Sequence, residues 1–194
     1  MIRNIVRATL AVVVLSVLTG LVYPLVMTGF AQVAIAGKAN GSIVKVDGKP
    51  VGSSMIGQAW KGPQWFYGRP SAIDNDASTS SGSNLGPSSQ ALADAIKERA
   101  KAIIALEGAY HSGLTTAQIP DDLLTASSSG LDPDITPAAA AFQAPRIAAA
   151  RHLPLSTVMK LIDDHTTSET LGFLGRPRVN VLELNLALQQ AAGQ

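Results

Sequence analysis

The 194-residue sequence contains no cysteine. A disulfide framework and a thiolate metal site are therefore excluded, and the redox compartment stays undetermined. The sequence has only three histidines, His111, His152 and His165, and no two of them are spaced as i and i+4 on a helix. Because zinc sites on helices use that spacing, a zinc site is not expected either.

Charged residues are also scarce. They make up 15% of the sequence, whereas about 25% is typical of soluble proteins. The formal net charge of +1 gives no electrostatic basis for binding nucleic acid. A long uncharged segment near the N-terminus explains part of the deficit. The rest suggests that a partner covers some of the surface of the domain.

Several catalytic and pore motifs are missing. The sequence has no Gly-Lys-Ser/Thr phosphate-binding ending, no Asp-Lys-Thr-Gly phosphorylation motif and no Thr-Val-Gly-Tyr-Gly selectivity filter. The Gly-x-Ser-x-Gly elbow of hydrolases is absent too, although serine is abundant. The chain is therefore neither the catalytic subunit nor the pore of a pump. A membrane-anchored serine–lysine hydrolase stays as an alternative.

The longest apolar run predicts a membrane span. No charged residue occurs between Arg7 and Lys38. Roughly 20 apolar residues in a helix cross a hydrocarbon core of about 30 Å, and lipid leaves backbone groups no partner outside the helix. We predict a transmembrane helix over residues 10–30, preceded by a cytoplasmic N-terminus (1–9) and followed by a single soluble domain (31–194). Pro24 falls late in the run, where a kink is tolerable.

This run has two other interpretations. A buried core helix is disfavoured because the segment has no polar face. A cleaved signal peptide would use Arg3 and Arg7 as its positive region and Ala34-Ile35-Ala36 as its cleavage site, but the run exceeds the usual apolar region of about 7–15 residues. In either membrane interpretation Arg3 and Arg7 hold the N-terminus in the cytoplasm, which makes the domain extracytoplasmic.

The rest of the sequence predicts an α+β domain that is mainly helical, with a small β-hairpin or sheet. Asp47-Gly48 between apolar runs is a hairpin signal, with strands over 43–46 and 49–56. Helical patterns cover residues 89–107 and 155–164. Another helix begins at Pro137 and contains Pro145, which is expected to break or kink it. A last helix begins at Asn180, which with Glu183 resembles a capping box, and its core face is predicted at Leu182, Leu186 and Val179.

Two segments are candidate partner surfaces. The aromatic–arginine segment, residues 60–69, gathers side-chain types that dominate interface energy: Trp60, Trp65, Phe66, Tyr67 and Arg69. Its alternative role is to pack the hairpin onto the domain. The polar stretch, residues 127–146, offers Ser127, Ser129, Asp132, Gln143 and Arg146. Its alternative role is a buried loop whose hydroxyls bond to its own backbone.

The loop around Ser81-Gly82-Ser83-Asn84-Leu85-Gly86-Pro87 is rich in small residues. Such loops can hold a phosphate when a strand precedes them and a lysine follows. Neither is present here, so the loop is a weak nucleotide signal.

Motifs along nearly the whole chain, taken in order, resemble those of the KdpC family, the C subunits of bacterial potassium-transporting Kdp ATPases. They are Ile56-Gly57-Gln58, Phe66-Tyr67-Gly68-Arg69-Pro70-Ser71-Ala72, Ser83-Asn84-Leu85-Gly86-Pro87, Ile119-Pro120-Asp121-Asp122-Leu123-Leu124, Ser129-Gly130-Leu131-Asp132-Pro133-Asp134-Ile135, Gln143, Arg146, Gly175-Arg176-Pro177 and Val179-Asn180-Val181-Leu182-Glu183-Leu184-Asn185.

The resemblance implies a non-catalytic accessory subunit of an ATP-driven potassium uptake complex in the bacterial inner membrane. Its partners would be a channel-like potassium-translocating subunit, a P-type ATPase subunit and a small fourth membrane peptide. No firmly bound cofactor is expected, because ATP and potassium act at the level of the complex. The family is commonly described as a catalytic chaperone that raises the ATP affinity of the ATPase subunit, with Ser83, Asn84, Gly86 and Gln143 as the nucleotide-facing candidates here. An extracytoplasmic domain cannot reach ATP, so we expect instead that it stabilises the assembly and supports the channel-like subunit from the outer face.

Overall fold

The computed structural model describes residues 1–193. The chain divides into two units, Met1–Ile43 and a second that begins at Val44. Each unit is described separately below.

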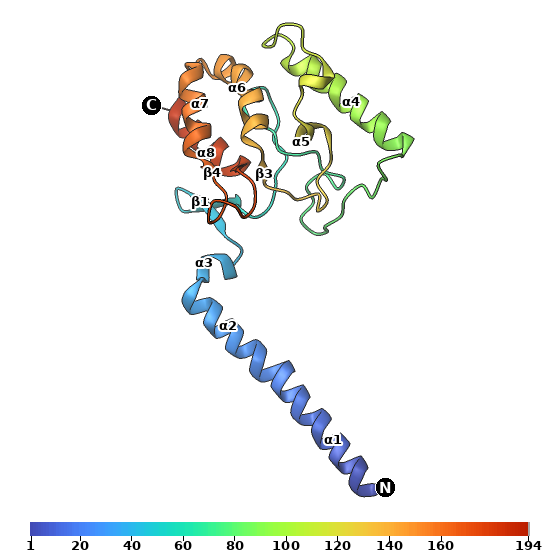
Figure 1. The fold of residues 1–194 in the computed structure, drawn as a ribbon. Helices are drawn as coiled ribbons and strands as arrows, with labels where there is room; N and C mark the ends of the chain where they lie inside the picture. The colour runs from blue at the N-terminus through green and yellow to red at the C-terminus, as the bar shows by residue number, and fades with distance from the viewer. Residues whose placement is uncertain (194) are drawn as a thin grey trace. The chain divides into compact units, whose positions relative to one another are not determined.

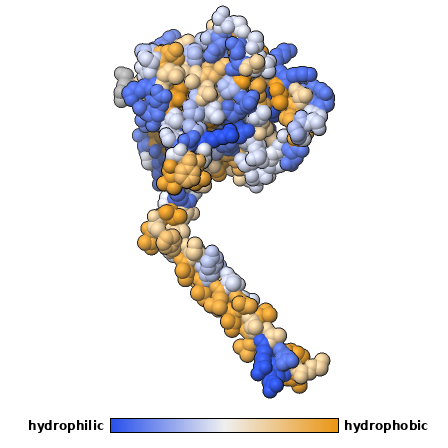
Figure 2. All heavy atoms as spheres, in the orientation of Figure 1, coloured by the Kyte–Doolittle hydropathy of each residue, from blue (hydrophilic) through white to orange (hydrophobic). Residues whose placement is uncertain are grey.

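The first unit is a long apolar helix followed by one short helix (Figure 1). It consists of α1 (Ile2–Val17), the π-helical turn η1 (Leu18–Val22), α2 (Tyr23–Ala34) and α3 (Ala36–Ala39). The stretch Ile2–Ala34 is continuous over 33 residues and is long and apolar enough to cross a membrane. Figure 2 shows hydrophobic residues along this helix, with hydrophilic ones near its N-terminal end. The helix is longer than the predicted span 10–30 and contains it.

The π turn lies where Pro24 enters the helix. Proline has no N–H, and its ring crowds the carbonyl four residues earlier, which here belongs to Gly20 in the π turn. A π turn changes the local hydrogen-bond register and accommodates such a residue. Thr19 Oγ1 also donates a hydrogen bond to the Leu15 carbonyl at 2.7 Å, a contact that often bends helices. The helix therefore passes Pro24 without ending.

The second unit begins with the predicted hairpin. Its strands are β1 (Ile43–Val46) and β2 (Lys49–Ser53), which form a two-stranded sheet. The turn residues Asp47 and Gly48 have φ of 51° and 77°, the left-handed values that a tight hairpin turn requires. The second strand ends at Ser53 rather than at the predicted residue 56.

A second, three-stranded antiparallel sheet was not assigned from the sequence. It joins β3 (Asp134–Ile135), β5 (Arg178–Asn180) and β4 (Thr166–Thr167) in the order β3-β5-β4. Val179 on the central strand pairs with Ile135 on one side and with Thr166 on the other. Strands this short carry too little alternation to be recognised in a sequence.

Helices make up most of the rest of this unit, and the fold class is α+β as predicted (Figure 1). They are α4 (Gln90–Glu107), the 3₁₀ turn η2 (Thr116–Gln118), α5 (Asp121–Leu124), α6 (Pro137–Arg151), α7 (Leu155–Asp164) and α8 (Val181–Ala192). The core lies chiefly between α6, α7, α8 and the sheet residues Ile135 and Val179.

Helix starts follow the predicted chemistry. Thr136 caps α6, with its hydroxyl accepting from Ala139 N–H at 3.1 Å, and Pro137 takes the first helical turn. Asn180 caps α8, with its side-chain oxygen accepting from Glu183 N–H at 3.1 Å. Both caps satisfy a backbone N–H that has no partner within the helix.

Two details of the helix predictions need correction. Of the break or kink expected at Pro145, the break does not occur, because α6 is continuous helix from Pro137 to Arg151. The buried residues Ala144, Arg146 and Ile147 around Pro145 hold the helix together despite the lost hydrogen bond. In α8 the fully buried leucines are Leu184 and Leu188, whereas Leu186 is only half-buried.

Candidate functional site

Two buried amide side chains hold the aromatic–arginine segment in place. Asn185 of α8 accepts from Phe66 N–H at 2.9 Å and donates to Phe66 O at 3.0 Å. Gln143 of α6 does the same for the next residue, accepting from Tyr67 N–H at 2.8 Å and donating to Tyr67 O at 3.0 Å. Each amide acts as a neighbouring strand would, because it offers one donor and one acceptor to the same residue.

A buried arginine fixes the start of the same segment. Arg146 is fully buried and donates to the carbonyls of Pro63 and Trp65, the latter at 3.1 Å, and to Gln143 Oε1 at 3.1 Å. Its Nε donates to Glu107 Oε1 at 2.7 Å. Its guanidinium also lies 5.0 Å from the centre of the Tyr67 ring. The cost of burying this charge is thus offset by a counter-ion, several acceptors and a ring face.

Glu107, at the end of α4, is the counter-ion and is itself only 2% exposed. Burial raises the pKa of its carboxyl from the ordinary value, and the pairing with Arg146 only partly opposes that shift. Its second oxygen has no hydrogen-bond partner among the described residues. Desolvation therefore outweighs the ion pair at this carboxyl.

The two tryptophans contact each other beside this network, with their ring planes tilted by 43°. The Trp60 and Trp65 rings are 5.0 Å apart, and the Arg151 guanidinium lies 4.2 Å from the Trp65 ring centre. Arg151 Nε also donates to Gln64 O at 2.9 Å. Burial lowers the pKa of Arg151 from its ordinary value. Three side chains of α6 and one of α8 therefore set the conformation of residues 63–67.

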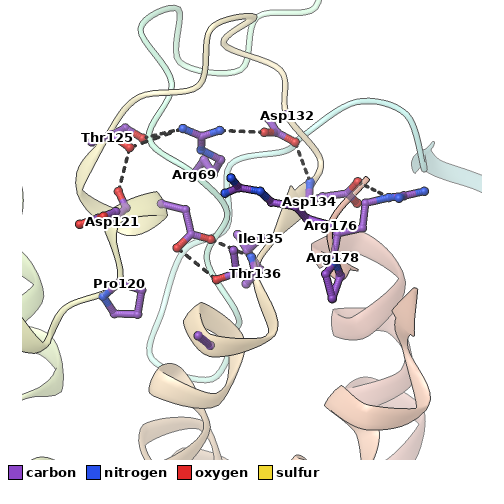
Figure 3. A pocket seen from close by; sticks show the side chains of 13 residues that line it. Arg69, Pro120, Asp121, Thr125, Asp132, Asp134, Ile135, Thr136, Arg176 and Arg178 are labelled. Carbon is purple, nitrogen blue, oxygen red and sulfur yellow. Dashed lines mark hydrogen bonds and ion pairs between the residues drawn. The ribbon is translucent and has the colours of Figure 1, made fainter. Parts of the chain in front are cut away.

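Arg69, at the end of the segment, lies in a charged cleft of about 720 Å³, the Arg69 cleft (Figure 3). Its side chain bonds Asp132 at 3.2 Å and approaches the carbonyls of Thr125 and Ala126 at 3.5 and 3.4 Å. The pair is about 30% exposed. The other charged residues that line the cleft are Asp121, Asp122, Asp134, Arg176 and Arg178.

Asp134 forms the second ion pair of the cleft. Its carboxylate lies 3.1 Å from Arg178 Nε and accepts from Asn180 Nδ2 at 3.3 Å. Desolvation raises the pKa of Asp134, Arg178 lowers it, and the neighbouring Asp132 adds to the rise. Among residues 1–193, no group of three or more histidine, aspartate or glutamate side chains is arranged to hold a metal ion.

The predicted surface residues separate into two groups. Trp60, Trp65, Tyr67, Arg69 and Asp132 are half-buried and keep part of their surface accessible. In contrast Phe66, Ser127 and Arg146 are buried inside the domain. The burial of Phe66 agrees with the packing alternative for its segment, and the burial of Ser127 and Arg146 agrees with the buried alternative for the polar stretch.

The polar stretch also bonds to the chain following Arg69. Ser127 N–H donates to Pro70 O at 3.0 Å, and Ser71 Oγ donates to Gly130 O at 2.7 Å. Ser129 accepts from Leu131 N–H at 3.1 Å through its own hydroxyl. The hydroxyl of Ser129 thus bonds to the stretch's own backbone, as the buried-loop alternative predicts.

The nucleotide-facing candidates do not share one environment. Ser83, Asn84 and Gly86 lie on an exposed loop. Gln143 is 2% exposed, and both ends of its amide are bonded within the domain. Gln143 therefore has no free group to offer a nucleotide in this structure.

The sequence matches the family described as "KdpC: K+-transporting ATPase, c chain" over residues 5–190. The chain belongs to the KdpC family. It is 52% identical over 189 residues to the potassium-transporting ATPase KdpC subunit of Ralstonia nicotianae, covering 95% of this chain and 90% of that one. The KdpC subunit of Acidobacterium capsulatum is 51% identical over 185 residues (94% and 96% covered), and that of Bradyrhizobium diazoefficiens is 46% identical over 208 aligned positions, with both chains covered in full.

Four important residues of this KdpC family member escaped the sequence analysis. Glu107 looked like the last residue of a solvated helix, and Asn185 like a polar position on the last helix. Asp134 and Arg178 lie 44 residues apart in sequence and meet through the β3–β5 pairing. Asn185 is a polar residue at a core-facing position of α8. Because a buried amide needs specific hydrogen-bond partners, that position was the signal in the sequence.

Proposed function

We propose that this chain is a non-catalytic accessory subunit of an ATP-driven potassium uptake complex, and that its domain stabilises the assembly from the outer face of the inner membrane. KdpC family membership supports the place in a potassium-transporting ATPase. The apolar helix Ile2–Ala34 supports a membrane anchor. Arg3 and Arg7, at the N-terminal end of that helix, support the outward orientation.

The observation that carries the docking role is that the aromatic–arginine segment keeps part of its aromatic and arginine side chains accessible while its backbone is already bonded within the domain. Trp60, Trp65, Tyr67 and Arg69 are half-buried. The N–H and C=O groups of Phe66 and Tyr67 are paired with amides of α6 and α8. Partly accessible aromatic and arginine side chains on a fixed backbone are the residue types that dominate interface energy. We therefore place the channel-like subunit, among the three expected partners, against this segment and the Arg69 cleft.

Substitution of Arg69 tests this role. Loss of a buried interface arginine costs about 2 kcal/mol or more, roughly 30-fold in affinity. Arg69→Ala should lower recovery of the intact complex in co-purification, while the isolated full-length chain still unfolds cooperatively. Lys160→Ala is the matched control, because Lys160 also pairs with an aspartate, at 2.7 Å, but on the exposed face of α7. Equal recovery for Arg69→Ala and Lys160→Ala would contradict the proposal.

The chaperone role stays as a second candidate because residues 83–86 are exposed and open to a partner. It predicts normal assembly and a raised ATP requirement when Ser83 and Asn84 are both replaced by alanine. The ATP concentration dependence of the purified complex separates the two roles. A shift in that dependence with assembly unchanged would favour the chaperone.

A catalytic role for the chain alone is not part of this proposal. His111 Nε2 lies 2.8 Å from the Phe142 carbonyl, and His165 Nδ1 lies 2.8 Å from the Leu161 carbonyl. One nitrogen of each ring is thus bonded to a backbone carbonyl, and neither ring has a part in the serine–lysine hydrolase alternative. The purified chain should hydrolyse neither ATP nor an ester substrate, and turnover lost on replacing one serine would support the hydrolase alternative.

A further inference from the structure

The loop between β4 and β5, residues 168–177 (the apolar loop), exposes three large apolar side chains. Leu171 is 81% exposed, Phe173 77% and Leu174 60%. Outside the N-terminal helix, no large apolar side chain among the described residues is more exposed than Leu171 and Phe173. Single exposed apolar residues need no explanation, but three within four positions form a patch that indicates a binding surface.

The backbone of the apolar loop forms a closed turn that leaves these side chains exposed to solvent. Thr170 N–H donates to Leu174 O at 2.8 Å, and Leu174 N–H donates to Thr170 O at 2.9 Å, which closes a tight turn. Leu171 has a φ of 58°, in the left-handed region, which is costly for a leucine. The turn therefore holds Leu171 in an unfavourable conformation with its side chain in water.

Charge at the apolar loop is nearly balanced. Glu169 precedes the closed turn, and the exposed Arg176 follows it. Arg178 is already paired with Asp134. Apolar contact rather than electrostatic attraction is therefore the dominant chemistry that the loop offers.

The apolar loop lies at the end of the second unit that also holds β1 and β2, the first strands of the unit. The loop leads into β5, a strand of three residues. At the far end of that strand Asn180 Nδ2 donates to Ser54 O at 2.8 Å, directly after β2 of the first hairpin. In Figure 1 this hairpin and the β4–β5 region lie at the same end of the unit. Ten residues join Ala34 to Val44, so the start of the second unit is tethered within about 36 Å of the end of the apolar helix.

From these observations we propose that the apolar loop inserts Leu171, Phe173 and Leu174 into the lipid–water interface of the bilayer that anchors the N-terminal helix. Aromatic and aliphatic side chains on a convex turn gain free energy by leaving water for the acyl boundary. This inference rests on the proposed membrane anchor, but it holds for either orientation of the chain.

The absence of cysteine allows a direct test with the full-length chain in phosphatidylcholine vesicles that carry brominated acyl chains. Phe173→Cys is labelled with an environment-sensitive fluorophore. Ser112→Cys, on an exposed loop, is the water-exposed control, and Val14→Cys in the apolar helix is the membrane control. Bromine should quench the label at position 173 at least several-fold more than at position 112. Adding Leu171→Gln and Leu174→Gln should remove most of that quenching.

The outcomes separate the possible causes. Equal quenching at positions 173 and 112, with position 14 quenched, overturns the loop insertion and leaves the anchor intact. Absence of quenching at position 14 overturns the anchor and the inference with it. If the label at 173 is shielded only in the assembled complex and is not quenched by bromine, the loop binds a protein partner, which also overturns the proposal.

Discussion

Arg146 connects most of the interactions that surround the aromatic–arginine segment. It is fully buried and bonds residues from three parts of the chain: Glu107, Gln143 and the carbonyls of Pro63 and Trp65. Such a residue serves as a positioning group, because its bonds join α6 to α4 and to the aromatic–arginine segment. The consequence is that its removal should disturb the segment and α4 together.

Arg146→Met tests this arrangement. Breaking a buried ion pair on one side costs about 3–5 kcal/mol, because Glu107 is left buried without a counter-ion. The free energy of unfolding of the full-length chain in detergent should fall by that amount in urea, followed by tryptophan fluorescence. Asp164→Asn removes an exposed ion pair and should change it by less than about 1 kcal/mol. A similar fall in the free energy of unfolding in both variants would show that the burial of the Arg146 ion pair adds nothing to stability.

The raised pKa of Glu107 predicts a pH dependence of stability. The folded chain binds a proton at Glu107 more tightly than the unfolded chain does. The contribution of Glu107 to the free energy of unfolding is therefore fully present below its ordinary pKa of about 4.5. It is lost as the pH rises through the pKa of the folded state. Glu107→Gln lacks this dependence, so its stability relative to wild type should rise over that pH range.

Urea unfolding at several pH values measures the difference between Glu107→Gln and wild type. A constant difference from pH 4 to pH 8 would mean that the pKa of Glu107 is not raised. A difference that moves in favour of wild type with rising pH would mean that Arg146 dominates and the pKa is lowered.

At the scale of elements, side-chain amides of α6 and α8 make the hydrogen bonds that a neighbouring β-strand would otherwise make. Residues 66 and 67 have their N–H and C=O groups paired with side-chain amides, one amide per residue. A strand would offer the same bonds but would need a sheet next to it. Side-chain amides from two helices let an extended segment cross a helical core with its backbone satisfied.

Asn185→Leu should remove both hydrogen bonds that the Asn185 amide makes to the backbone of Phe66. Two buried backbone groups then lose their partners, at about 1–3 kcal/mol each. Hydrogen exchange at the Phe66 amide should accelerate strongly in the full-length chain. Gln189→Leu, at an exposed position of the same helix, should leave that exchange rate unchanged. Unaltered protection in Asn185→Leu would show that Phe66 is held by packing alone.

Local chemistry made some of these elements predictable. The Asp47-Gly48 turn, the Thr136-Pro137 start of α6 and the Asn180 cap of α8 each depend on neighbouring residues, so their motifs are visible in the sequence. The β3–β5 pairing and the Glu107–Arg146 pair join residues about 40 positions apart. Their partners are set by tertiary packing, which no local pattern encodes.

The same distinction applies to the candidate site. Sequence composition identified the aromatic–arginine segment and the polar stretch, and the structure joins them at Arg69 and Asp132. Burial could not be assigned from composition. Phe66 and Arg146 belong to residue types common both in cores and at interfaces, and only their surroundings place them inside.

At the scale of the whole molecule, the orientation of the chain in the membrane is a prediction. It rests on Arg3 and Arg7, with Lys38, Lys45 and Lys49 on the other side of the helix opposing it. Single cysteines at Ser78 and Ser112 test it, because both positions are exposed and the chain has no other thiol. An impermeant thiol reagent should label both in intact cells once the outer membrane is permeabilised. Labelling that occurs only after lysis of the inner membrane would reverse the orientation.

The amide pairs of Phe66 and Tyr67 also impose an order in time. Phe66 emerges during synthesis 119 residues before Asn185, and Tyr67 emerges 76 residues before Gln143. Contacts between residues so far apart form late, since loop closure must come first. The aromatic–arginine segment therefore stays unfixed on the growing chain until α8, its last support, has been made. Truncation of α8 before Asn185 would leave Phe66 without the amide that pairs with its backbone.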